Sequence, residues 1–284
     1  MPLNTEPPTF CLYLHNNNMS AYPDLKDKVT LASLAQKKKR GQKITALTAY
    51  DYPTALLVDG SGVDIVLVGD SLGMEELGYD TTVPVTMEIM LHHTKAVRRG
   101  TRRALLVADM PFLSYQVNAD EAVRNAGRLM QEGEASAVKL EGGAFVAATI
   151  RRLVQSGIPV MAHIGFTPQS VHQIGLRKQG KDEAGARQVQ EDAQAVQEAG
   201  AFAVVLELIP EVLAAQITEA LSIPTVGIGA GAGCSGQVLV TSDLIGLRPD
   251  RPPLRHVRQY AQVGAEIARA LSAYREEVEA GKFP

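Results

Sequence analysis

The sequence predicts an α/β fold in which eight parallel strands alternate with helices and close into a barrel. Short aliphatic runs recur along the chain, and their length suits strands buried on both faces better than helices. Each of five runs stops at a residue with a reactive side chain: Asp70, Asp109, Glu141, His163 and Glu207. Barrel enzymes carry their catalytic residues at the carboxyl ends of several strands, so this repetition favours a βα barrel. A doubly wound sheet is the competing architecture.

The composition of the chain is that of a globular protein. Of 284 residues, 45% are hydrophobic and 21% are charged, which is the balance of a globular protein with a large core. The net charge of −3 gives no reason to expect nucleic acid or a membrane surface as a partner. Cys11 and Cys234 are too few for a disulfide framework, and no apolar run reaches the length of a membrane span. We therefore expect a soluble protein, and the small number of cysteines fits a reducing cytoplasm.

The chain divides into a leader and one domain. Residues 1–18 lack the apolar core of a secretory signal, because two prolines and three consecutive asparagines interrupt them. We expect residues 1–28 to be a disordered leader, with Met19 as a candidate true start. Residues 29–284 are expected to form a single (βα)8 barrel domain with a C-terminal helix.

The first half of the chain contains four of the predicted strands. Gly41, Gly100 and Gly133 mark the ends of helices, and Asn118 with Glu121 fits an N-cap and its capping-box acid. The lysine run at the end of the first helix is expected to be solvated. The elements predicted here are helices over 31–40, 53–59, 86–99 and 119–132, and strands over 43–51, 65–68, 104–109 and 136–141.

The second half repeats the alternation. Pro210 suits the first turn of a helix, and the glycine-containing stretch 167–186 is long for a loop between a strand and a helix. That stretch is expected to be a functional loop or lid. The predicted elements are helices over 144–156, 187–199, 211–221 and 257–280, the last an amphipathic cover for the barrel or a neighbouring subunit, and strands over 158–163, 201–208, 223–228 and 237–240.

Strand alternation places a lysine and an acid on one face. Ala137, Lys139 and Glu141 share one side of their strand, and Val138 and Leu140 face the helices. A buried lysine is costly unless it is paired or binds an anion. A structural ion pair with Glu141 and an anion-binding role both remain open.

Two aspartates end neighbouring strands. Asp70 and Asp109 could lie close together, and a cation would relieve the repulsion between their carboxylates. Mg²⁺ fits, because it takes one or two carboxylates, several waters and substrate oxygens. No Cys/His cluster with zinc spacing competes. Each aspartate taken alone could instead cap the loop that follows it.

The remaining candidates lie further along the chain. Glu207 stands within V-V-L-E-L-I-P, and aliphatic surroundings tune a carboxylate for general acid or base work near neutral pH. The alternative is a buried ion pair with an arginine. His163 could bind an anion or move a proton, or could be a core histidine, whereas His92 and His93 are expected at the surface of a helix. The glycine run 227–233 is a weak dinucleotide motif and is better explained as a tight rim where a ligand approaches, and an anion there remains an option.

Seven sequence blocks in order resemble the ketopantoate hydroxymethyltransferase family, from about residue 31 to residue 284. The blocks are T-A-Y-D at 48–51, V-G-D-S-L-G-M at 68–74, L-V-A-D-M-P-F at 106–112, V-K-L-E-G-G at 138–143, H-I-G-F-T-P-Q-S at 163–170, L-E-L-I-P at 206–210 and G-I-G-A-G at 227–231. One departure lies at 174–181, where I-G-L-R-K-Q-G-K lacks the tyrosine usual in the family. That departure concerns loop closure rather than the reaction.

The resemblance implies a barrel of the phosphoenolpyruvate/pyruvate type, assembled as a cytoplasmic homodecamer. It implies transfer of a one-carbon unit from 5,10-methylenetetrahydrofolate to 3-methyl-2-oxobutanoate, giving 2-dehydropantoate for pantothenate biosynthesis. Position by position, the implied Mg²⁺ ligands are Asp70, Asp109 and Glu141. The implied contacts of the keto acid are Asp70, Ser71, Asp109 and Lys139, to which the residues themselves add His163. Glu207 is the implied proton acceptor.

Two other functions stay open. A metal-dependent C–C lyase or mutase on the same barrel would need an enolate but no folate. A scaffold without activity is disfavoured by the intact set Asp70, Asp109, Lys139, Glu141 and Glu207. Folate-dependent turnover distinguishes the hydroxymethyltransferase from the lyase or mutase.

Overall fold

The computed structural model describes residues 28–250, 254 and 257–284. The predicted leader, apart from residue 28, lies outside these residues, as does the candidate start at Met19. The chain forms two compact units, with the boundary between Val238 and Leu239.

The first unit is a closed barrel whose strands pair in sequence order from β1 to β8. Every neighbouring pair from β1 to β8 is parallel. The eight-stranded barrel predicted from the sequence is therefore confirmed, and the doubly wound sheet is excluded. The strands are β1 (Ile44–Thr48), β2 (Ile65–Val68), β3 (Leu105–Asp109), β4 (Ala137–Glu141), β5 (Val160–Gly165), β6 (Ala203–Glu207), β7 (Thr225–Ile228) and β8 (Gly236–Leu239).

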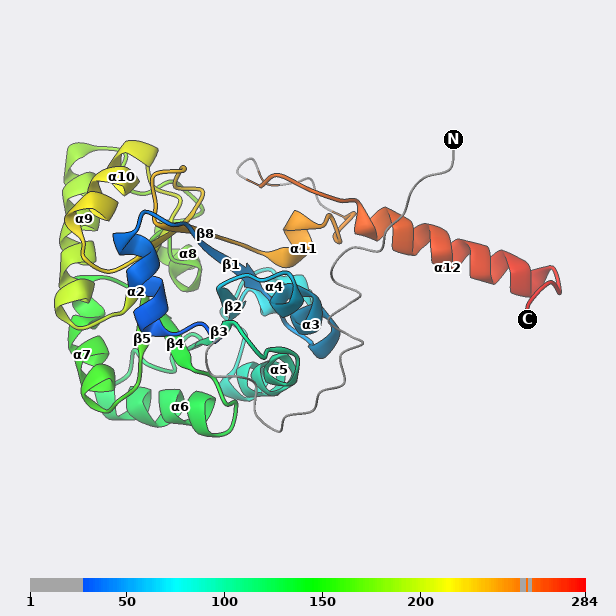
Figure 1. The fold of residues 1–284 in the computed structure, drawn as a ribbon, viewed down its shortest axis with the longest axis horizontal. Coiled ribbons are helices and arrows are strands. Elements are labelled where there is room, and N and C mark those ends of the chain that lie inside the picture. The colour runs from blue at the N-terminus through cyan, green and yellow to red at the C-terminus, as the bar shows by residue number, and fades with distance from the viewer. Residues whose placement is uncertain (1–27, 251–253, 255–256) are drawn as a thin grey trace. The chain divides into compact units, whose positions relative to one another are not determined.

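Helices lie outside the strands, and Figure 1 shows α6, α7, α9 and α10 around one side of the barrel. The Asn118 side chain accepts a hydrogen bond from the Glu121 amide at 2.8 Å, so the predicted N-cap of α6 is confirmed. The helices of this unit are α2 (Leu31–Lys39), α3 (Tyr52–Gly60), α4 (Leu72–Glu75), α5 (Met87–Gly100), α6 (Ala119–Gln131), α7 (Ala147–Gln155), α8 (Val171–Ile174), α9 (Glu183–Glu198) and α10 (Glu211–Ala220), with short 3₁₀ turns η2 (Ala144–Val146) and η3 (Pro168–Ser170).

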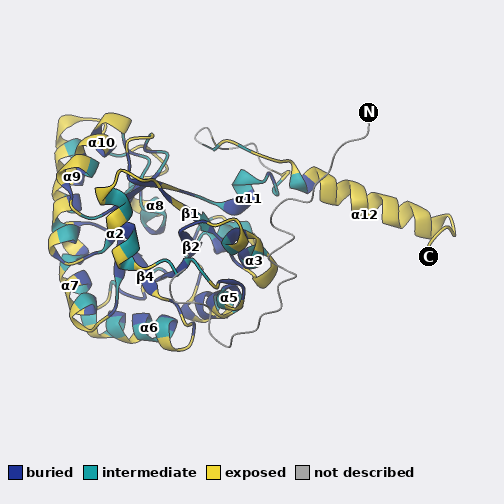
Figure 2. Ribbon diagram, viewed as in Figure 1, coloured by how far each residue is buried: buried dark blue, intermediate teal, exposed yellow. Residues whose placement is uncertain are grey.

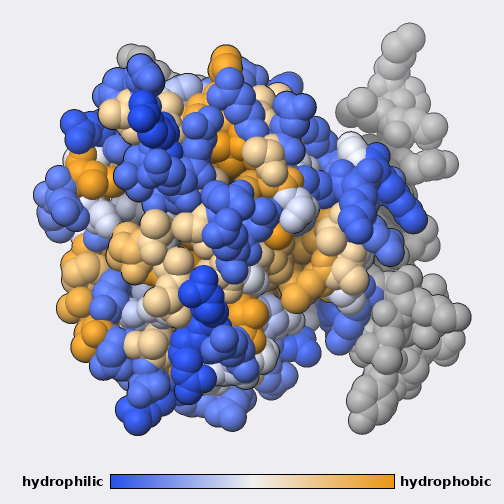
Figure 3. Space-filling view, turned by 90° about the vertical axis from the view of Figure 1, so that its left-hand side faces the viewer, coloured by the Kyte–Doolittle hydropathy of each residue, from blue (hydrophilic) through white to orange (hydrophobic). Residues whose placement is uncertain are grey.

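The barrel interior and the strand–helix layer are two separate apolar clusters. In β4, Ala137 belongs to the interior cluster, whereas Val138 and Leu140 belong to the cluster between strands and helices. Because side chains alternate along a strand, Lys139 and Glu141 continue the interior column above Ala137. The apolar interior thus gives way to charged groups toward the carboxyl ends of the strands. The outer face over α7, α9 and α10 mixes hydrophilic and hydrophobic residues (Figure 3).

The lysine run of α2 is not simply solvated, and that prediction was wrong. Lys37 pairs with the buried Asp64 at 2.6 Å. The Lys38 ammonium donates to the carbonyl oxygens of Thr218, Leu221 and Ile223 at 2.9, 2.7 and 2.8 Å. These carbonyls lie at the C-terminal end of α10 and just beyond it, where a cation is favourable. The run ties α2 to the segment before β7.

Two predicted boundaries shift in ways that matter for the site. β5 ends at Gly165 rather than at residue 163, so two residues follow His163 within the strand. The stretch 167–186 contains η3 and α8, and α9 begins at Glu183 because the Asp182 side chain caps it through the Gly185 amide. Only part of that stretch is therefore irregular.

The second unit contains α11 (Thr241–Leu244) and α12 (Val263–Glu279), and only Gly264 of α12 is buried (Figure 2). The predicted helix over 257–280 starts six residues late. The amides of Tyr260 and Val263 donate to carbonyls at Leu244 and Ile245, which holds the preceding segment out of the helix. No helix in the described part of the chain could cross a bilayer.

Candidate active site

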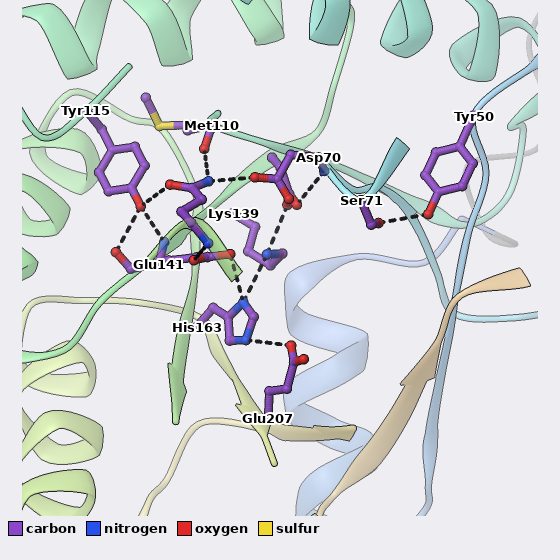
Figure 4. Close-up of polar contacts among 11 residues, drawn as sticks. Tyr50, Asp70, Ser71, Met110, Tyr115, Lys139, Glu141, His163 and Glu207 are labelled. Carbon is purple, nitrogen blue, oxygen red and sulfur yellow. Dashed lines mark hydrogen bonds and ion pairs between the residues drawn. The ribbon is translucent and has the colours of Figure 1, made fainter. Parts of the chain in front are cut away.

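Five strands bring the predicted residues to one end of the barrel. Asp70 follows β2, Asp109 ends β3, Lys139 and Glu141 lie in β4, His163 lies in β5 and Glu207 ends β6. The β3–β4 register pairs Asp109 with Lys139, and the β4–β5 register pairs Glu141 with His163. All are at most 5% exposed except Glu207, whose side chain is 16% exposed. Figure 4 shows the side chains of Asp70, Lys139, Glu141, His163 and Glu207 turned toward one another.

Asp109 is the partner of both Asp70 and Lys139. The Asp70 amide donates to Asp109 Oδ2 at 3.0 Å, and the Lys139 ammonium lies 3.2 Å from Asp109 Oδ1. The structural ion pair of Lys139 therefore joins neighbouring strands through Asp109 rather than forming with Glu141. This pair keeps the lysine charged in a buried position.

Gln169, in η3, was missed by the sequence reasoning. Its side-chain nitrogen donates to Asp70 Oδ2 at 2.8 Å and to the Met110 carbonyl at 2.9 Å, and its amide donates to Glu141 Oε2 at 3.0 Å. Tyr115 donates to the Gln169 side-chain oxygen at 2.8 Å. Gln169 lies in a loop and not at a strand end, so strand periodicity gave no signal for it, although the motif at 163–170 contains it.

His163 connects Lys139 to Glu207. Nδ1 lies 3.2 Å from the Lys139 ammonium, and Nε2 lies 3.1 Å from Glu207 Oε2. A lysine ammonium only donates, so Nδ1 is the acceptor and the ring proton lies on Nε2, facing Glu207. Burial, and then the Lys139 charge, lower the pKa of His163, which keeps the imidazole neutral.

The buried acids resist ionisation in the absence of a cation. Burial and then the Asp109 charge raise the pKa of Asp70 to about 7. Burial and then the Asp70 charge raise the pKa of Glu141 well above its ordinary value. Burial opposes the charge of Lys139, but Asp109 and Glu141 outweigh it and raise its pKa. One lysine does not fully balance three neighbouring carboxyl groups.

The donor set fits a hard divalent cation that brings its own waters. The buried oxygens Asp109 Oδ1 and Glu141 Oε1 have no hydrogen-bond donor among the described residues, since Lys139 approaches Asp109 Oδ1 without hydrogen-bond alignment. Within the described ranges no three His, Cys, Asp or Glu side chains form a preformed metal cluster. Mg²⁺ does not need one, because it keeps several waters and binds through one or two carboxylates plus substrate oxygens.

Ser71 lies on the β1 side of the site. Its hydroxyl is 2.8 Å from the hydroxyl of Tyr50, which is buried at the end of β1. A Cβ at Gly69 would lie 2.8 Å from the Ser71 hydroxyl, so a larger residue there would displace this hydroxyl from its present position. Burial raises the pKa of the Tyr50 phenol, so the phenol stays protonated and can donate to Ser71.

Other sequence candidates lie outside this group. His92 is exposed as expected, but His93 is half-buried and its Nδ1 lies 2.6 Å from the Tyr50 carbonyl, so its surface prediction was wrong. In the glycine run 227–233, a Cβ at Gly231 would strike the Glu211 side chain, and the Ala232 amide donates to Glu211 at 3.3 Å. An acid at this position disfavours anion binding there.

The fold and the site together define a class: a barrel enzyme with buried carboxylates, a lysine and a histidine–glutamate pair at its strand ends, a set of groups suited to acid–base chemistry. Comparison of the chain with known protein families identifies one family within this class. Residues 28–284 match the family model described as ketopantoate hydroxymethyltransferase. The chain belongs to this family.

Curated relatives share the family with this chain, and solved structures share its fold. The 3-methyl-2-oxobutanoate hydroxymethyltransferase of Chloroflexus aurantiacus is 56% identical over 257 residues, covering 90% of this chain and 91% of the relative. The enzyme of the same name from Moorella thermoacetica is 56% identical, covering 91% and 96%. Phosphonopyruvate hydrolase with oxalate and Mg²⁺ superposes with a TM-score of 0.58 at 14% identity, covering 88% of this chain and 87% of that chain. Phosphoenolpyruvate phosphomutase from Streptomyces platensis gives 0.59 at 15%, covering 89% and 88%. These structures show the fold alone.

Proposed function

We propose that this enzyme transfers a hydroxymethyl group from 5,10-methylenetetrahydrofolate to 3-methyl-2-oxobutanoate and so forms 2-dehydropantoate, the committed step toward pantothenate. Family membership supports the reaction. The single observation that carries the mechanism is the connected series Lys139–His163–Glu207 beside three buried carboxyl groups. It supplies both a charge to stabilise an enolate and a carboxylate to create one.

Asp70, Asp109 and Glu141 are the residues that would hold Mg²⁺. Asp109 Oδ1 and Glu141 Oε1 accept no hydrogen bond from a described residue, and the pKa values of Asp70 and Glu141 are raised, which together support a cation at this place. When bound, Mg²⁺ supplies a Lewis acid that withdraws electrons from the keto acid and acidifies its C3–H bond.

Glu207 is the proposed base. Oε2 lies 3.1 Å from His163 Nε2, an ion-pair contact without hydrogen-bond alignment, and no described residue approaches Oε1 as a donor, so Oε1 is available for the substrate proton. The same His163 contact stabilises the carboxylate before the transfer. The partial exposure of Glu207 gives it access to a substrate that enters from the strand ends.

The remaining polar groups bind and orient the keto acid. Lys139 supplies the positive charge for its carboxylate and for the enolate, with Ser71 and His163 on either side. Asp70 and Asp109 contact it from the β2–β3 side. The enolate carbon then attacks the methylene carbon of the donor, whose bonds to the folate nitrogens break to release tetrahydrofolate, and one water supplies the hydroxyl group of the product. The 167–186 segment limits the access of other water to the enolate.

Turnover with and without folate tests the proposal. We expect purified protein with Mg²⁺ to form 2-dehydropantoate only when 5,10-methylenetetrahydrofolate is present. The competing lyase would release a keto acid from a longer substrate without any pterin, and only fold neighbours at 14–15% identity point that way. Folate-independent C–C cleavage together with no folate-dependent product would favour the lyase.

We also propose a cytoplasmic homodecamer, on the family resemblance. Sedimentation velocity at micromolar concentration checks the assembly: a single species of ten chains is expected, and a stable monomer or dimer would refute it.

A further inference from the structure

A second cavity opens beside the candidate active site. It has a volume of about 310 Å³, within the range of small-molecule pockets. It lies between the ends of β4 and β5 and the side of α9, and we call it the β4–β5 rim pocket. Its lining includes Gly143, Phe145, Gly165, Thr167, Gln188 and Asp192.

The pocket adjoins the site through the backbone. Its lining includes Gly142, directly after Glu141, and Thr167, two residues before Gln169. Gly165 is the register partner of Glu207 across β5 and β6. A ligand here would therefore lie next to the proposed base, at the same end of the barrel.

One carboxylate is built into the pocket. Asp192 Oδ1 accepts from the Ala144 amide at 2.8 Å and from the Gln188 side chain at 3.2 Å, whereas Oδ2 has no hydrogen-bond partner among the described residues. A Cβ at Gly143 would lie 1.9 Å from Oδ1, so glycine is required for Asp192 to reach this position. The result is a fixed acceptor with one oxygen free.

An exposed aromatic ring completes the pocket. Phe145 is 77% exposed, which is unusual for a phenylalanine in the first turn after a buried strand. Its ring lies against the backbone of Gly142, where a Cβ would be 2.6 Å from the ring. One part of the ring is thus anchored and the rest is open for stacking.

The chemistry excludes a second keto acid. The lining includes Asp192 but no lysine or arginine, so it repels anions. It suits instead a flat, neutral heteroaromatic ring with N–H donors on one edge. The aminopyrimidinone edge of a pterin has such donors for Asp192 Oδ2, and Thr167 and Gln188 offer donors to the acceptors elsewhere on the ring.

We infer that the β4–β5 rim pocket takes the pterin ring of the one-carbon donor, an inference that rests on the proposed function. Asp192 accepts hydrogen bonds from the N–H donors on the aminopyrimidinone edge of the pterin, and Phe145 stacks on the pterin ring. The pterin then presents its methylene carbon toward the keto acid from the β4–β6 side, next to Glu207.

Two variants and a matched control test this inference. Asp192→Asn keeps an oxygen that can accept from Ala144 but replaces the free acceptor with a donor. Phe145→Ala removes the stacking surface. Glu191→Gln, the same kind of change one residue away at an exposed position of α9, is the control. The readouts are KM for 5,10-methylenetetrahydrofolate, KM for the keto acid, and Mg²⁺-dependent exchange of the keto acid C3 proton without folate.

We expect Asp192→Asn to raise KM for the folate by about 10- to 100-fold and Phe145→Ala to raise it by about 10-fold. Both should keep the wild-type exchange rate and keto acid KM, and Glu191→Gln should match wild type throughout. An unchanged folate KM in both variants would overturn the pterin pocket while leaving the transferase reaction intact. Loss of exchange in both would make the pocket a structural support of the keto acid site. Absence of folate-dependent turnover in the wild type would instead contradict the proposed function.

Discussion

At the scale of single residues, the site depends on how buried carboxyl groups share a few donors. Asp109 accepts a hydrogen bond from the Asp70 amide and forms an ion pair with the Lys139 ammonium. Gln169 donates hydrogen bonds to Asp70 and Glu141. The acids and the lysine could be found from the sequence, because each lies in or at the end of an aliphatic run. Gln169 could not, because its role depends on where a loop folds back across three strands.

Glu207→Gln tests the base. The amide cannot accept the C3 proton, so we expect turnover to fall by about 10²- to 10⁴-fold while keto acid affinity changes little. Steady-state kinetics and calorimetric titration of the keto acid measure the two quantities. Near-normal turnover would assign proton removal to another group.

Gln169→Ala tests the support of the acids. Asp70 would lose the hydrogen bond from the Gln169 side chain, and Glu141 would be held less precisely by the backbone amide of residue 169. We therefore expect the affinity for Mg²⁺ to fall by about 10- to 100-fold, as for other residues that orient metal ligands. Isothermal titration with Mg²⁺ measures it. Gln194→Ala, an exposed glutamine on α9, is the control. Equal affinities in both variants would mean that Gln169 does not position the acids.

At the scale of elements, strands were easier to predict than their ends. Buried aliphatic runs mark most of the strands, but the carboxyl end of β5 depends on Gly165, whose φ of +91° lets the chain turn beside Glu207. The start of α12 and the role of Lys38 likewise depend on contacts with distant segments. The predicted cover that α12 gives to the barrel or to a neighbouring subunit stays a prediction.

Gly165→Ala should be strongly destabilising. The new Cβ would lie 2.4 Å from the Glu207 carbonyl oxygen in a backbone conformation that alanine rarely adopts. We expect a loss of about 1–3 kcal/mol, or roughly 2–4 °C in Tm per kcal/mol.

Gly127→Ala in α6 is the matched control, since nothing lies within 4 Å of its added Cβ. There the same substitution should stabilise by about 0.5–1 kcal/mol. Thermal unfolding of both variants measures the difference, and equal Tm changes would show that the turn at Gly165 is not constrained.

At the scale of the whole molecule, the fold and the set of reactive strand ends followed from the sequence, because barrel topology sends the carboxyl ends of all parallel strands to one face. The β4–β5 rim pocket did not, since Asp192 enters it from a helix 48 residues away from Ala144. Long-range proximity of that kind has no periodic signature.

Metal binding should stabilise the fold in a pH-dependent manner. The pKa of Asp70 is raised from 3.8 to about 7, so the metal-free fold favours the protonated acid and loses stability as pH rises through this window. Mg²⁺ binds the ionised form and removes that cost. We expect the affinity for Mg²⁺ to be about 10-fold higher at pH 8 than at pH 6. At a fixed Mg²⁺ concentration, the metal should therefore stabilise the fold by about 1.4 kcal/mol more at pH 8 than at pH 6, and the rise in Tm should be larger at pH 8. Differential scanning calorimetry measures it, and a larger Mg²⁺ effect at pH 6 would reverse the assignment.

The most direct measurement is NMR-detected exchange of the C3 proton of 3-methyl-2-oxobutanoate for deuterium, in the absence of folate. If carboxyl groups from separate strands gather a cation and a base around one keto acid, the wild-type enzyme exchanges the proton with Mg²⁺, stops when Mg²⁺ is chelated, and loses exchange in Glu207→Gln. Exchange that persists without a divalent cation, or that survives in Glu207→Gln, would contradict the account.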